Sequence, residues 1–448
     1  MSPVAALPER LRIAGGVALH GELSTPGDKS ISHRALILGA LADGWSELRG
    51  LSDGDDVTHT AAAVVALGAE VEMAADGAWR VRGGRDRLQA SGAVIECGNS
   101  GTSLRLLAGL VAGLAGRTTL AGDDSLSARP MDRISVPLGA MGATVEGRGT
   151  RCLPPVTITG RALRGIEWRP PVASAQVKSC ILLAGLDADG PTTVHESVPT
   201  RAHTEEMLAE AGADIDVEPE GAGRVVRLRP STLSPLTLSV PGDPSQAAFW
   251  LVAASILPGS RITVRNVYVG PDRIGYLRVL ERMGAAIEIR PTGHRVADLT
   301  ATHAPLVGTD VEAAEIPSLD EIPILSVAAT LARGTTRFRD VGELRVKESD
   351  RLAGVVSMVT GFGGTAEAYG DTLAVEGLGP FGRPATGSFH SDGDHRLAMA
   401  ATVLALAAPG TSMVAGFASV ATSYPGFLTD LGALAGAVVA TDALDDQR

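Results

Sequence analysis

The chain has 448 residues, and 39 lysines and arginines against 51 aspartates and glutamates give a net charge of −12 at pH 7. Aromatic side chains make up only 3% of the residues, whereas glycine is abundant at 54 residues. An acidic chain with so few aromatic rings lacks the basic grooves and stacking platforms of nucleic-acid-binding proteins. We therefore expect no nucleic-acid partner. A small anion remains a suitable partner, because local charge can oppose net charge.

Other classes of protein are also disfavoured. Cys97, Cys152 and Cys180 form no C-x-x-C pair, which argues against a disulfide framework and against a cysteine-rich zinc site. Free thiols are typical of a reducing cytosol. The opening residues MSPVAALPERLRIAGG have neither the layout of a secretory signal nor that of a transit peptide, and no run of about 18 apolar residues is present to span a bilayer. We expect a soluble, cytoplasmic protein without a membrane partner.

Two series of glycines divide the chain into six repeats of about 73 residues. Each glycine of the first series follows an apolar run of helix length; these are Gly44, Gly116, Gly190, Gly259, Gly334 and Gly410. The second series precedes stretches such as GAEVE and GATVE; it comprises Gly68, Gly142, Gly212, Gly284, Gly363 and Gly436. Because glycine adopts the left-handed conformation at little cost, both series are expected at helix ends.

Along the chain, each repeat is predicted to contain a helix, a strand, a second helix and a second strand. The stretches after the second glycines alternate with the two-residue period of a half-buried strand. A further strand is predicted over residues 79–82, 156–159, 225–229 and 373–376. The sixth repeat ends near Thr441 without such a strand, so residues 17–24 are predicted to supply it. The start of the chain would then lie beside its end.

Matching PGDKS and PGDPS turns mark the places where the chain is expected to cross between two lobes of three repeats each. The predicted C-terminal lobe comprises residues 1–25 and 242–448, and the predicted N-terminal lobe comprises residues 26–241. A solenoid is the alternative architecture, but its repeats are usually about 20–50 residues long.

The repeats share apolar bodies and differ where the first helix starts, at PGDKS, CGNSGTS, VASAQVK, PGDPSQ, SLDEIP and GDHRL. Helix N-termini present free N–H groups and favour anions. N-capping explains the Asp, Ser and Asn residues of these segments, but it does not explain Lys29, Gln176 or Arg396. We interpret several of the starts as converging on one site for an anionic ligand.

Other charged residues support an anion site. Lys347 and Arg351 are four residues apart, so on one helix the two cations would share a face and repel each other. Glu348 would reduce this repulsion in part. An anion bound between Lys347 and Arg351 explains their spacing more specifically. His395 is interpreted as a capping or structural residue, since no partner ligands stand at metal spacing. Cys97 is interpreted as a small buried thiol and not as a nucleophile.

With these motifs in place, the sequence resembles the EPSP synthase (3-phosphoshikimate 1-carboxyvinyltransferase) family over essentially its whole length. The resemblance rests on PGDKSISHRAL (26–36), GNSGTSLR (98–105), ARPM (128–131), ASAQVKS (173–179), PGDPS (241–245), LDEIPIL (319–325), LRVKESDRL (344–352), DHRLAM (394–399) and TSYPGF (422–427). ASAQVKS and LDEIP resemble the second class of the family. The resemblance implies the α/β enolpyruvyl transferase fold, a two-lobed inside-out α/β barrel of six βαβαββ repeats, with the active site in the cleft between the lobes. We expect a monomer.

The implied reaction transfers the enolpyruvyl group of phosphoenolpyruvate to the 5-hydroxyl of 3-phosphoshikimate, without a metal or an organic cofactor. By motif, the residues expected to bind 3-phosphoshikimate are Lys29, Ser30, Arg34, Ser174, Ala175, Gln176, Arg201, Asp320 and Lys347. Those expected to bind phosphoenolpyruvate are Lys29, Gly101, Arg129, Gln176, Arg351 and Arg396. The expected catalytic residues are Lys29, Asp320 and Glu348. Asp320 would accept the hydroxyl proton, and Glu348 would donate a proton to the methylene carbon and later remove one.

The sequence departs from the family pattern at a few positions. Thr422 stands where many members carry Lys, and Glu343 stands where the first class tends to have Asn. Gly101 occupies a position where some second-class members carry Ala. Two alternatives are a UDP-N-acetylglucosamine enolpyruvyl transferase and a non-catalytic repeat scaffold. The former would have Lys-Asn in place of Lys29-Ser30 and a cysteine near ARPM. The latter predicts no special placement of the charged residues.

Overall fold

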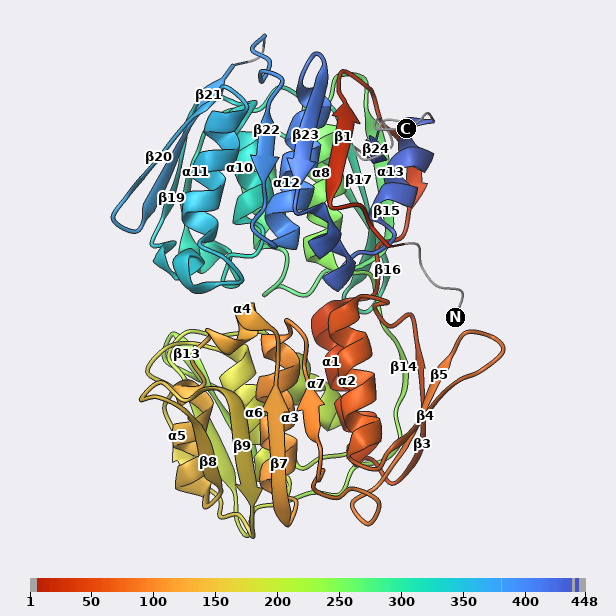
Figure 1. Ribbon diagram of the computed structural model, residues 1–448, viewed down its shortest axis with the longest axis vertical. Coiled ribbons are helices and arrows are strands. Elements are labelled where there is room, and N and C mark those ends of the chain that lie inside the picture. The colour runs from red at the N-terminus through yellow and green to blue at the C-terminus, as the bar shows by residue number, and fades with distance from the viewer. Residues whose placement is uncertain (1–5, 380, 437–439, 443–448) are drawn as a thin grey trace. The chain divides into compact units, whose positions relative to one another are not determined.

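The computed structural model describes residues 6–379, 381–436 and 440–442, and the chain divides into two compact units (Figure 1). The N-terminal unit is Gly27–Val240, and the C-terminal unit is Met1–Pro26 with Pro241–Arg448. These bounds lie one residue from the lobe bounds expected from the sequence. None of the helices in the described residues is both long enough and apolar enough to cross a membrane.

The strands of the described residues form six four-stranded sheets with one shared topology. The sheet of the second repeat is an example. Its edge strand β6 (Val94–Glu96) pairs in parallel with β7 (Gly116–Ala121), which pairs antiparallel with β9 (Leu153–Gly160). The last strand, β8 (Thr144–Arg148), is antiparallel to β9. One such sheet per repeat confirms the six-fold repeat and the βαβαββ unit.

The other sheets repeat this pairing with their own strands. In the N-terminal unit they are β14 (Thr237–Ser239), β3 (Gly44–Arg49), β5 (Trp79–Gly83), β4 (Glu70–Met73), and then β10 (Glu167–Trp168), β11 (Thr192–Glu196), β13 (Gly223–Leu228), β12 (Ile215–Glu220). In the C-terminal unit the first two are β2 (His20–Leu23), β15 (Arg261–Tyr268), β17 (Val296–Thr302), β16 (Ala286–Gly293), and β18 (Asp310–Glu312), β19 (Arg333–Arg339), β21 (Thr372–Leu378), β20 (Thr365–Tyr369). The third is β22 (Ser388–His390), β23 (Thr411–Ala415), β1 (Arg10–Ala14), β24 (Ala440–Asp442). The four additional strands predicted from the sequence are confirmed as β5, β9, β13 and β21.

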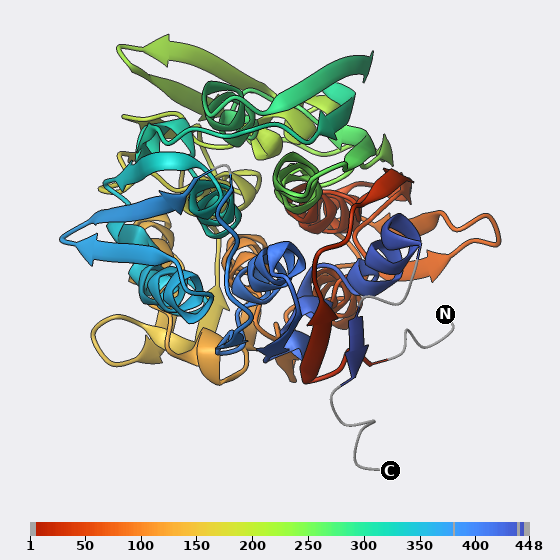
Figure 2. The same ribbon diagram turned by 90° about the horizontal axis from the view of Figure 1, so that it is seen from above.

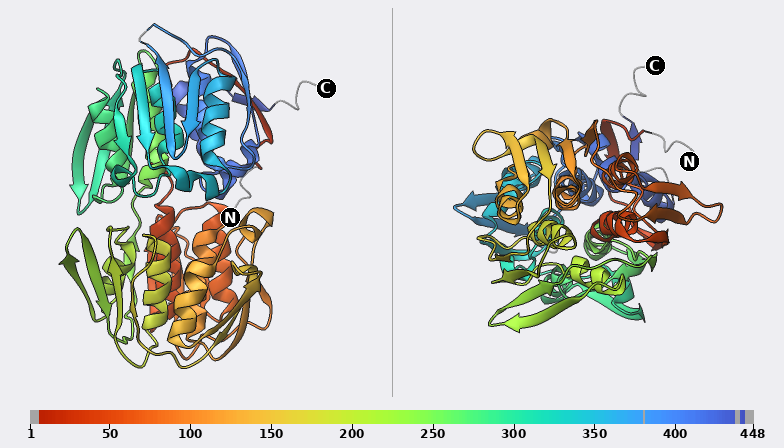
Figure 3. Two further views of the ribbon diagram at one scale, coloured as in Figure 1. Left: turned by 90° about the vertical axis from the view of Figure 1, so that its left-hand side faces the viewer. Right: turned by 90° about the horizontal axis from the view of Figure 1, so that it is seen from below.

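The first helix of each repeat is buried, and the sheets lie outside it. These helices are α1 (Lys29–Leu41), α3 (Gly101–Ala112), α6 (Ala175–Gly185), α8 (Pro244–Ile256), α10 (Ile322–Thr330) and α12 (His395–Ala407). Every residue of α8 is buried, as expected for a helix that is apolar on all sides. Figure 2 shows α8, α10 and α12 at the centre of the C-terminal unit, and Figure 3 shows the same arrangement in the N-terminal unit. Each unit is therefore built inside out, with helices within and sheets around them.

The second helices are buried along part of their surface. They are α2 (Asp55–Ala66), α5 (Asp132–Met141), α7 (His203–Glu210), α9 (Gly275–Arg282), α11 (Arg351–Gly361) and α13 (Phe427–Ala435). Shorter turns are α4 (Asp124–Ser127), η1 (Ala313–Glu315), η2 (Gly342–Val346) and η3 (Phe417–Thr422).

The two glycine series differ in their conformations. All six glycines of the second series have positive φ, and Gly142 and Gly436 are the C-cap residues of α5 and α13. The prediction of helix ends is confirmed for this series. For the first series it is wrong at Gly44, Gly116 and Gly334, which lie at the starts of strands β3, β7 and β19. The other three, Gly190, Gly259 and Gly410, lie in the turns between helix and strand. The φ angles of Gly44 and Gly116, 125° and 121°, turn the chain from the preceding helix end into the strand.

The prediction that residues 17–24 complete the sixth repeat is wrong, because β1 completes it. Ile13 of β1 pairs with Ser412 of β23 on one side and with Ala440 of β24 on the other. A central strand needs alternate buried side chains, and β1 buries Leu11 and Ile13. Strand β2 buries none of its side chains and lies at a sheet edge, parallel to β15. Residues 437–439 of the strand expected after Gly436 lie outside the described residues.

Each crossing of the chain is preceded by a strand that stays in the unit the chain is leaving. Strand β2 comes before α1 along the sequence but pairs with β15 of the C-terminal unit. Strand β14 comes before α8 but pairs with β3 of the N-terminal unit. Both strands lie in the units expected from the PGDKS and PGDPS turns, but the repeat pattern alone does not reveal which sheet each strand joins.

A buried side chain of β1 tests the closure of the sixth sheet. We expect Ile13→Ala to lower the free energy of unfolding by about 2–5 kcal/mol, because Ile13 is fully buried and the truncation leaves a cavity. The measurement is urea unfolding followed by circular dichroism. Arg10→Ala, in the same strand but at an exposed position, should change stability by less than about 0.5 kcal/mol. Equal effects of the two substitutions would contradict the packing of β1.

Candidate active site

The six polar segments predicted to start helices do start the six buried helices. Five of them carry a side chain that accepts a hydrogen bond from the first turn; these caps are Asp28, Ser100, Ser174, Asp243 and Asp394. N-capping therefore accounts for these Asp and Ser residues, as predicted. It leaves the neighbouring Lys29, Gln176 and Arg396 to be explained by other contacts.

In the N-terminal unit, Lys29 is the first residue of α1, and its Nζ lies 2.9 Å from Oδ2 of Asp56 on α2. Only 18% of the Lys29 side chain and 10% of the Asp56 side chain are exposed. Asp56 holds the ammonium group in one place and balances part of its charge. The sequence patterns did not single out Asp56, which lies in the first turn of α2 and belongs to none of the motifs.

Arg34 and Ser30 are one turn apart on α1 and contact each other. Arg34 donates to the hydroxyl of Ser30 at 2.7 Å, to Thr204 at 2.6 Å and to Ser179 at 2.7 Å. Its guanidinium therefore joins α1 to α6 and α7, and only 2% of the residue is exposed. Arg201 lies in the segment just before α7, two residues from the helix start.

Three more candidates gather at the starts of α3 and α6. Gln176 accepts from Arg105 at 2.6 Å and donates to Thr102 at 2.8 Å. A Cβ atom on Gly101 would come within 2.8 Å of a guanidinium nitrogen of Arg105 and within 3.4 Å of one of Arg129. Two arginines thus lie against the N-terminus of α3, which is a favourable place for an anion.

Arg129 is held in that position by polar side chains. It donates to Oδ1 of Asn99 at 2.6 Å and to the hydroxyl of Ser125 at 3.1 Å. Asn99 in turn donates to Asp123 at 2.7 Å. Ala175 and Ser174 lie at the first turn of α6, where the Ser174 hydroxyl caps the helix. The capping contact leaves the Ser174 hydroxyl able to donate its own hydrogen.

A buried ionic network holds the segment that carries Arg201. Lys178 of α6 pairs with Glu196 at 2.9 Å and with Glu205 at 2.7 Å, and all three side chains are at most 3% exposed. Arg224 pairs with the same two carboxylates. Burial raises the pKa of Glu196, but Lys178 and Arg224 outweigh it and the net pKa is lowered. The buried Lys178 and the partly exposed Arg224 thus balance two buried carboxylates, Glu196 and Glu205, which flank Arg201 in the sequence.

In the C-terminal unit, three cations surround Asp320. Its carboxylate lies 3.2 Å from Arg351, 3.7 Å from Arg396 and 4.0 Å from Lys347. Asp320 precedes α10, Arg351 is the first residue of α11, and Arg396 lies in the first turn of α12. Three helix starts of one unit therefore bring together four residues that the sequence singled out.

Arg351 also contacts two further carboxylates. It is fully buried and pairs with Asp394 at 2.8 Å and with Glu348. Burial lowers the pKa of Arg351, but the carboxylates of Asp394, Glu348 and Asp320 outweigh this effect and raise it. The contact of Asp394 with Arg351 was not predicted, although the start of α12 was. An N-cap aspartate in a helix start rich in cations was the available signal.

The helical spacing argument for Lys347 and Arg351 is wrong. Turn η2 ends at Val346 and α11 begins at Arg351, with Asp350 as its N-cap, so the two cations do not share a helix face. Both nevertheless approach Asp320, and Lys347 also donates to the carbonyl oxygen of Ser318 at 3.0 Å. Their proximity arises from the bent segment 347–350 between η2 and α11.

The other residues singled out from the sequence either lie outside these groups of charged residues or already make other hydrogen bonds. Cys97 is fully buried, and burial raises the pKa of its thiol to about 12, which confirms that it is a buried thiol. The hydroxyl of Thr422 donates to the carbonyl of Ser419 at 2.8 Å, and Glu343 is exposed. Within the described residues, no three His, Cys, Asp or Glu side chains are arranged to hold a metal ion.

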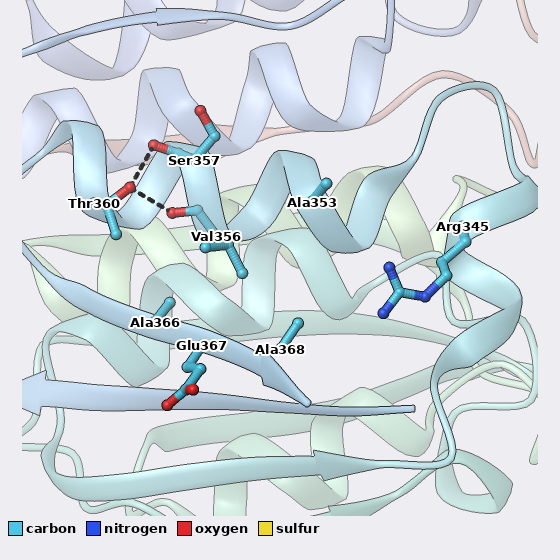
Figure 4. Close-up of a pocket in the computed structure, with 8 residues that line it drawn as sticks. All are labelled: Arg345, Ala353, Val356, Ser357, Thr360, Ala366, Glu367 and Ala368. Carbon is cyan, nitrogen blue, oxygen red and sulfur yellow. Dashed lines mark hydrogen bonds between the residues drawn. The ribbon is translucent and has the colours of Figure 1, made fainter. Parts of the chain in front are cut away.

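A shallow pocket of about 600 Å³ lies elsewhere on the C-terminal unit, between α11 and β20 (Figure 4). Ala353, Val356 and Ala368 line it, together with Arg345 and Glu367. None of the candidate residues borders this pocket. It therefore does not belong to the group around Asp320.

Comparison with known proteins gives one consistent result. The model of the EPSP synthase (3-phosphoshikimate 1-carboxyvinyltransferase) family matches residues 13–431. The 3-phosphoshikimate 1-carboxyvinyltransferase of Synechococcus sp. (strain JA-3-3Ab) is 45% identical, over 96% of this chain and 98% of the relative. The 3-phosphoshikimate 1-carboxyvinyltransferase of Acidiphilium cryptum (strain JF-5) is 46% identical, over 98% of this chain and 100% of the relative. The solved structure of EPSP synthase from Acinetobacter baumannii superposes with a TM-score of 0.84 at 36% identity, over 96% of this chain and 99% of the other.

The raised pKa of Cys97 has a measurable consequence. The thiolate is the reactive form, so at about pH 8.5, near the ordinary thiol pKa, Cys97 of the folded protein should react with iodoacetamide at least about 100-fold more slowly than in urea. Mass spectrometry of the digested protein measures labelling at each cysteine. Equal rates in the folded and unfolded chains would contradict the buried thiol.

Proposed function

This chain belongs to the EPSP synthase (3-phosphoshikimate 1-carboxyvinyltransferase) family, and from that premise we propose how its residues bind the substrates and move the protons of the transfer. The enzyme joins phosphoenolpyruvate to 3-phosphoshikimate, giving 5-enolpyruvylshikimate 3-phosphate and phosphate. Both substrates are anions that carry a phosphate and a carboxylate. The concentration of cations in this acidic chain suits such ligands.

The residues of the N-terminal unit bind the substrates. Lys29, Ser30 and Arg34 contact the phosphoshikimate, together with Ser174, Ala175, Gln176 and Arg201. The fixed positions of Lys29 against Asp56 and of Arg34 against Thr204 support this role, because little side-chain entropy is lost on binding. Lys29 also contacts phosphoenolpyruvate, as do Gln176, Gly101 and Arg129. The open Cα of Gly101 leaves the Arg105 and Arg129 guanidinium groups close to the helix start.

The residues of the C-terminal unit carry out the proton transfers. Asp320 binds the 5-hydroxyl and removes its proton as the oxygen attacks C2 of phosphoenolpyruvate, and Glu348 protonates the methylene carbon C3. In the tetrahedral adduct, the bond from C2 to the phosphate oxygen then breaks. Glu348 takes back a proton from the new methyl group, and phosphate leaves. Apart from the C–O bond that forms and the one that breaks, the two steps need only proton transfers, and we propose that they proceed without a metal or an organic cofactor.

One observation carries this assignment: Asp320 and Glu348 both contact the buried Arg351, while Lys347 and Arg396 flank Asp320. Two carboxylates with separate proton roles are thereby held among cations. Lys347 binds phosphoshikimate, and Arg351 and Arg396 bind phosphoenolpyruvate. A non-catalytic scaffold would not require three cations on one carboxylate. We propose that the two groups of residues serve one reaction in a single chain, in the cytoplasm, where the three buried cysteines remain thiols.

The acceptor specificity is tested by measuring phosphate release from phosphoenolpyruvate. We expect release with 3-phosphoshikimate and none with UDP-N-acetylglucosamine, since the chain has Ser30 after Lys29 and no cysteine near residues 128–131. Release with UDP-N-acetylglucosamine alone would favour the alternative transferase. Release with neither acceptor would contradict both transferase assignments.

Glu348→Gln tests the proton donor. We expect kcat to fall by about 100-fold or more, the usual contribution of a positioned acid or base, while calorimetry shows that 3-phosphoshikimate still binds. Arg351 keeps its contacts with Asp394 and Asp320, so the site should survive the substitution. Glu343→Gln, the same change at an exposed position nearby, is the control and should retain turnover. Normal turnover by Glu348→Gln would remove Glu348 from the mechanism.

A further inference from the structure

We propose that Ser318 and Glu321 are positioning residues that hold Asp320 in place for proton transfer. The proposal rests on the function proposed above, in which Asp320 accepts the proton of the 5-hydroxyl. Neither residue contacts the substrates in that scheme. Their role follows from the shape of the turn that carries Asp320 and from the buried hydrogen bonds that fix it.

The turn before α10 has an unfavourable backbone conformation. Leu319 has a φ of 57°, in the left-handed region that L-residues with branched side chains rarely adopt. Its side chain is 4% exposed, so packing holds the residue there. Asp320 is the next residue, and the direction of its carboxylate depends on this conformation. Contacts that stabilise the turn therefore also orient the proposed base.

Glu321 supplies such contacts and is not used as a helix cap. It occupies the N-cap position of α10, yet its side chain makes no capping hydrogen bond to the helix. It accepts hydrogen bonds from the hydroxyl of Ser318 at 3.1 Å and from that of Ser245 on α8 at 2.5 Å. With 3% of the residue exposed, this carboxylate is buried beneath the turn. It links the two ends of the turn to the neighbouring helix.

Ser318 closes the turn from its other side. Besides donating to Glu321, its hydroxyl accepts from the backbone N–H of Asp320 at 3.4 Å, and its carbonyl oxygen accepts from Lys347 at 3.0 Å. The hydroxyl thus contacts the backbone of the proposed base, and the carbonyl contacts a cation that also flanks that base. Displacement of Ser318 would move Asp320 relative to Lys347, Arg351 and Arg396.

The support extends into the interior of the unit. Arg273 donates to Ser245 at 3.0 Å and pairs with Asp243, the N-cap of α8, at 3.1 Å. All three residues are at most 5% exposed. A chain of buried polar contacts therefore runs from the start of α8 to the turn. Such a chain restricts the serine hydroxyls that reach Glu321 to one arrangement, which is what a positioned base needs.

Ser318→Ala and Ser318→Thr test the proposal in the full-length enzyme. We expect Ser318→Ala to lower kcat about tenfold, because a small displacement of a base slows proton transfer. KM for both substrates should stay within about twofold, since the ligand-binding cations and the Ser318 carbonyl remain. Ser318→Thr keeps the hydroxyl and should retain most of the wild-type kcat. Glu321→Gln, which removes the charge beneath the turn, should lower kcat in the same way with unchanged KM.

Ser326→Ala is the matched control, because it removes a buried hydroxyl from α10 that donates to Pro323 and does not touch the turn. It should leave kcat unchanged. A wild-type kcat for Ser318→Ala would overturn the proposal. So would a kcat for Ser318→Thr as low as that of Ser318→Ala, or an equal fall of kcat in Ser326→Ala. Wild-type enzyme that releases no phosphate would instead refute the proposed function. If Glu321→Gln does not fold, the three serine variants still decide the question.

Discussion

The C-terminal unit depends on the burial of one guanidinium group. Arg351 has no exposed side-chain surface, and a buried charge is tolerated only when partners balance it. Asp394, Glu348 and Asp320 provide that balance from the starts of three helices. Because removing one partner of a buried ion pair costs about 3–5 kcal/mol, the arrangement of these helix starts is fixed by charge as well as by packing. The residues proposed for proton transfer are thus also those that stabilise the unit.

The N-terminal unit also balances buried charge with partners of opposite sign, but there the charges that need balancing are carboxylates. There the buried carboxylates Glu196 and Glu205 are balanced by Lys178 and Arg224. This network holds the segment that carries Arg201, so the balance of buried charge does not rest on the proposed substrate contacts. The two units therefore use their buried charges differently. One takes part in the proposed chemistry, and the other supports the residues that bind.

The repeat and the helix starts could be predicted because each has a local cause. Glycines with positive φ end the second helices, and Asp or Ser caps begin the first ones, so both features leave marks in the sequence. The PGDKS and PGDPS turns mark where the chain crosses between units, but nothing marks which sheets β2 and β14 join, because pairing between distant strands depends on the whole sheet. The same holds for the pairing of Asp56 with Lys29 and of Asp394 with Arg351. They become identifiable only when two helix starts are seen to meet, and the helical spacing assumed for Lys347 failed because η2 and α11 are separate.

The place of β1 bears on the order in which the chain is made and folded. A domain generally folds as a unit, the N-terminal part first during synthesis. All strands of the N-terminal unit, up to β14, precede α8 in the sequence. This unit therefore has all of its strands before the ribosome has made most of the C-terminal unit. Strand β1 is made first but gains its neighbours only with β23 and β24, near the end of the chain. The earliest strand to emerge therefore waits longest for its partners, and its apolar Leu11 and Ile13 need protection until translation is nearly complete.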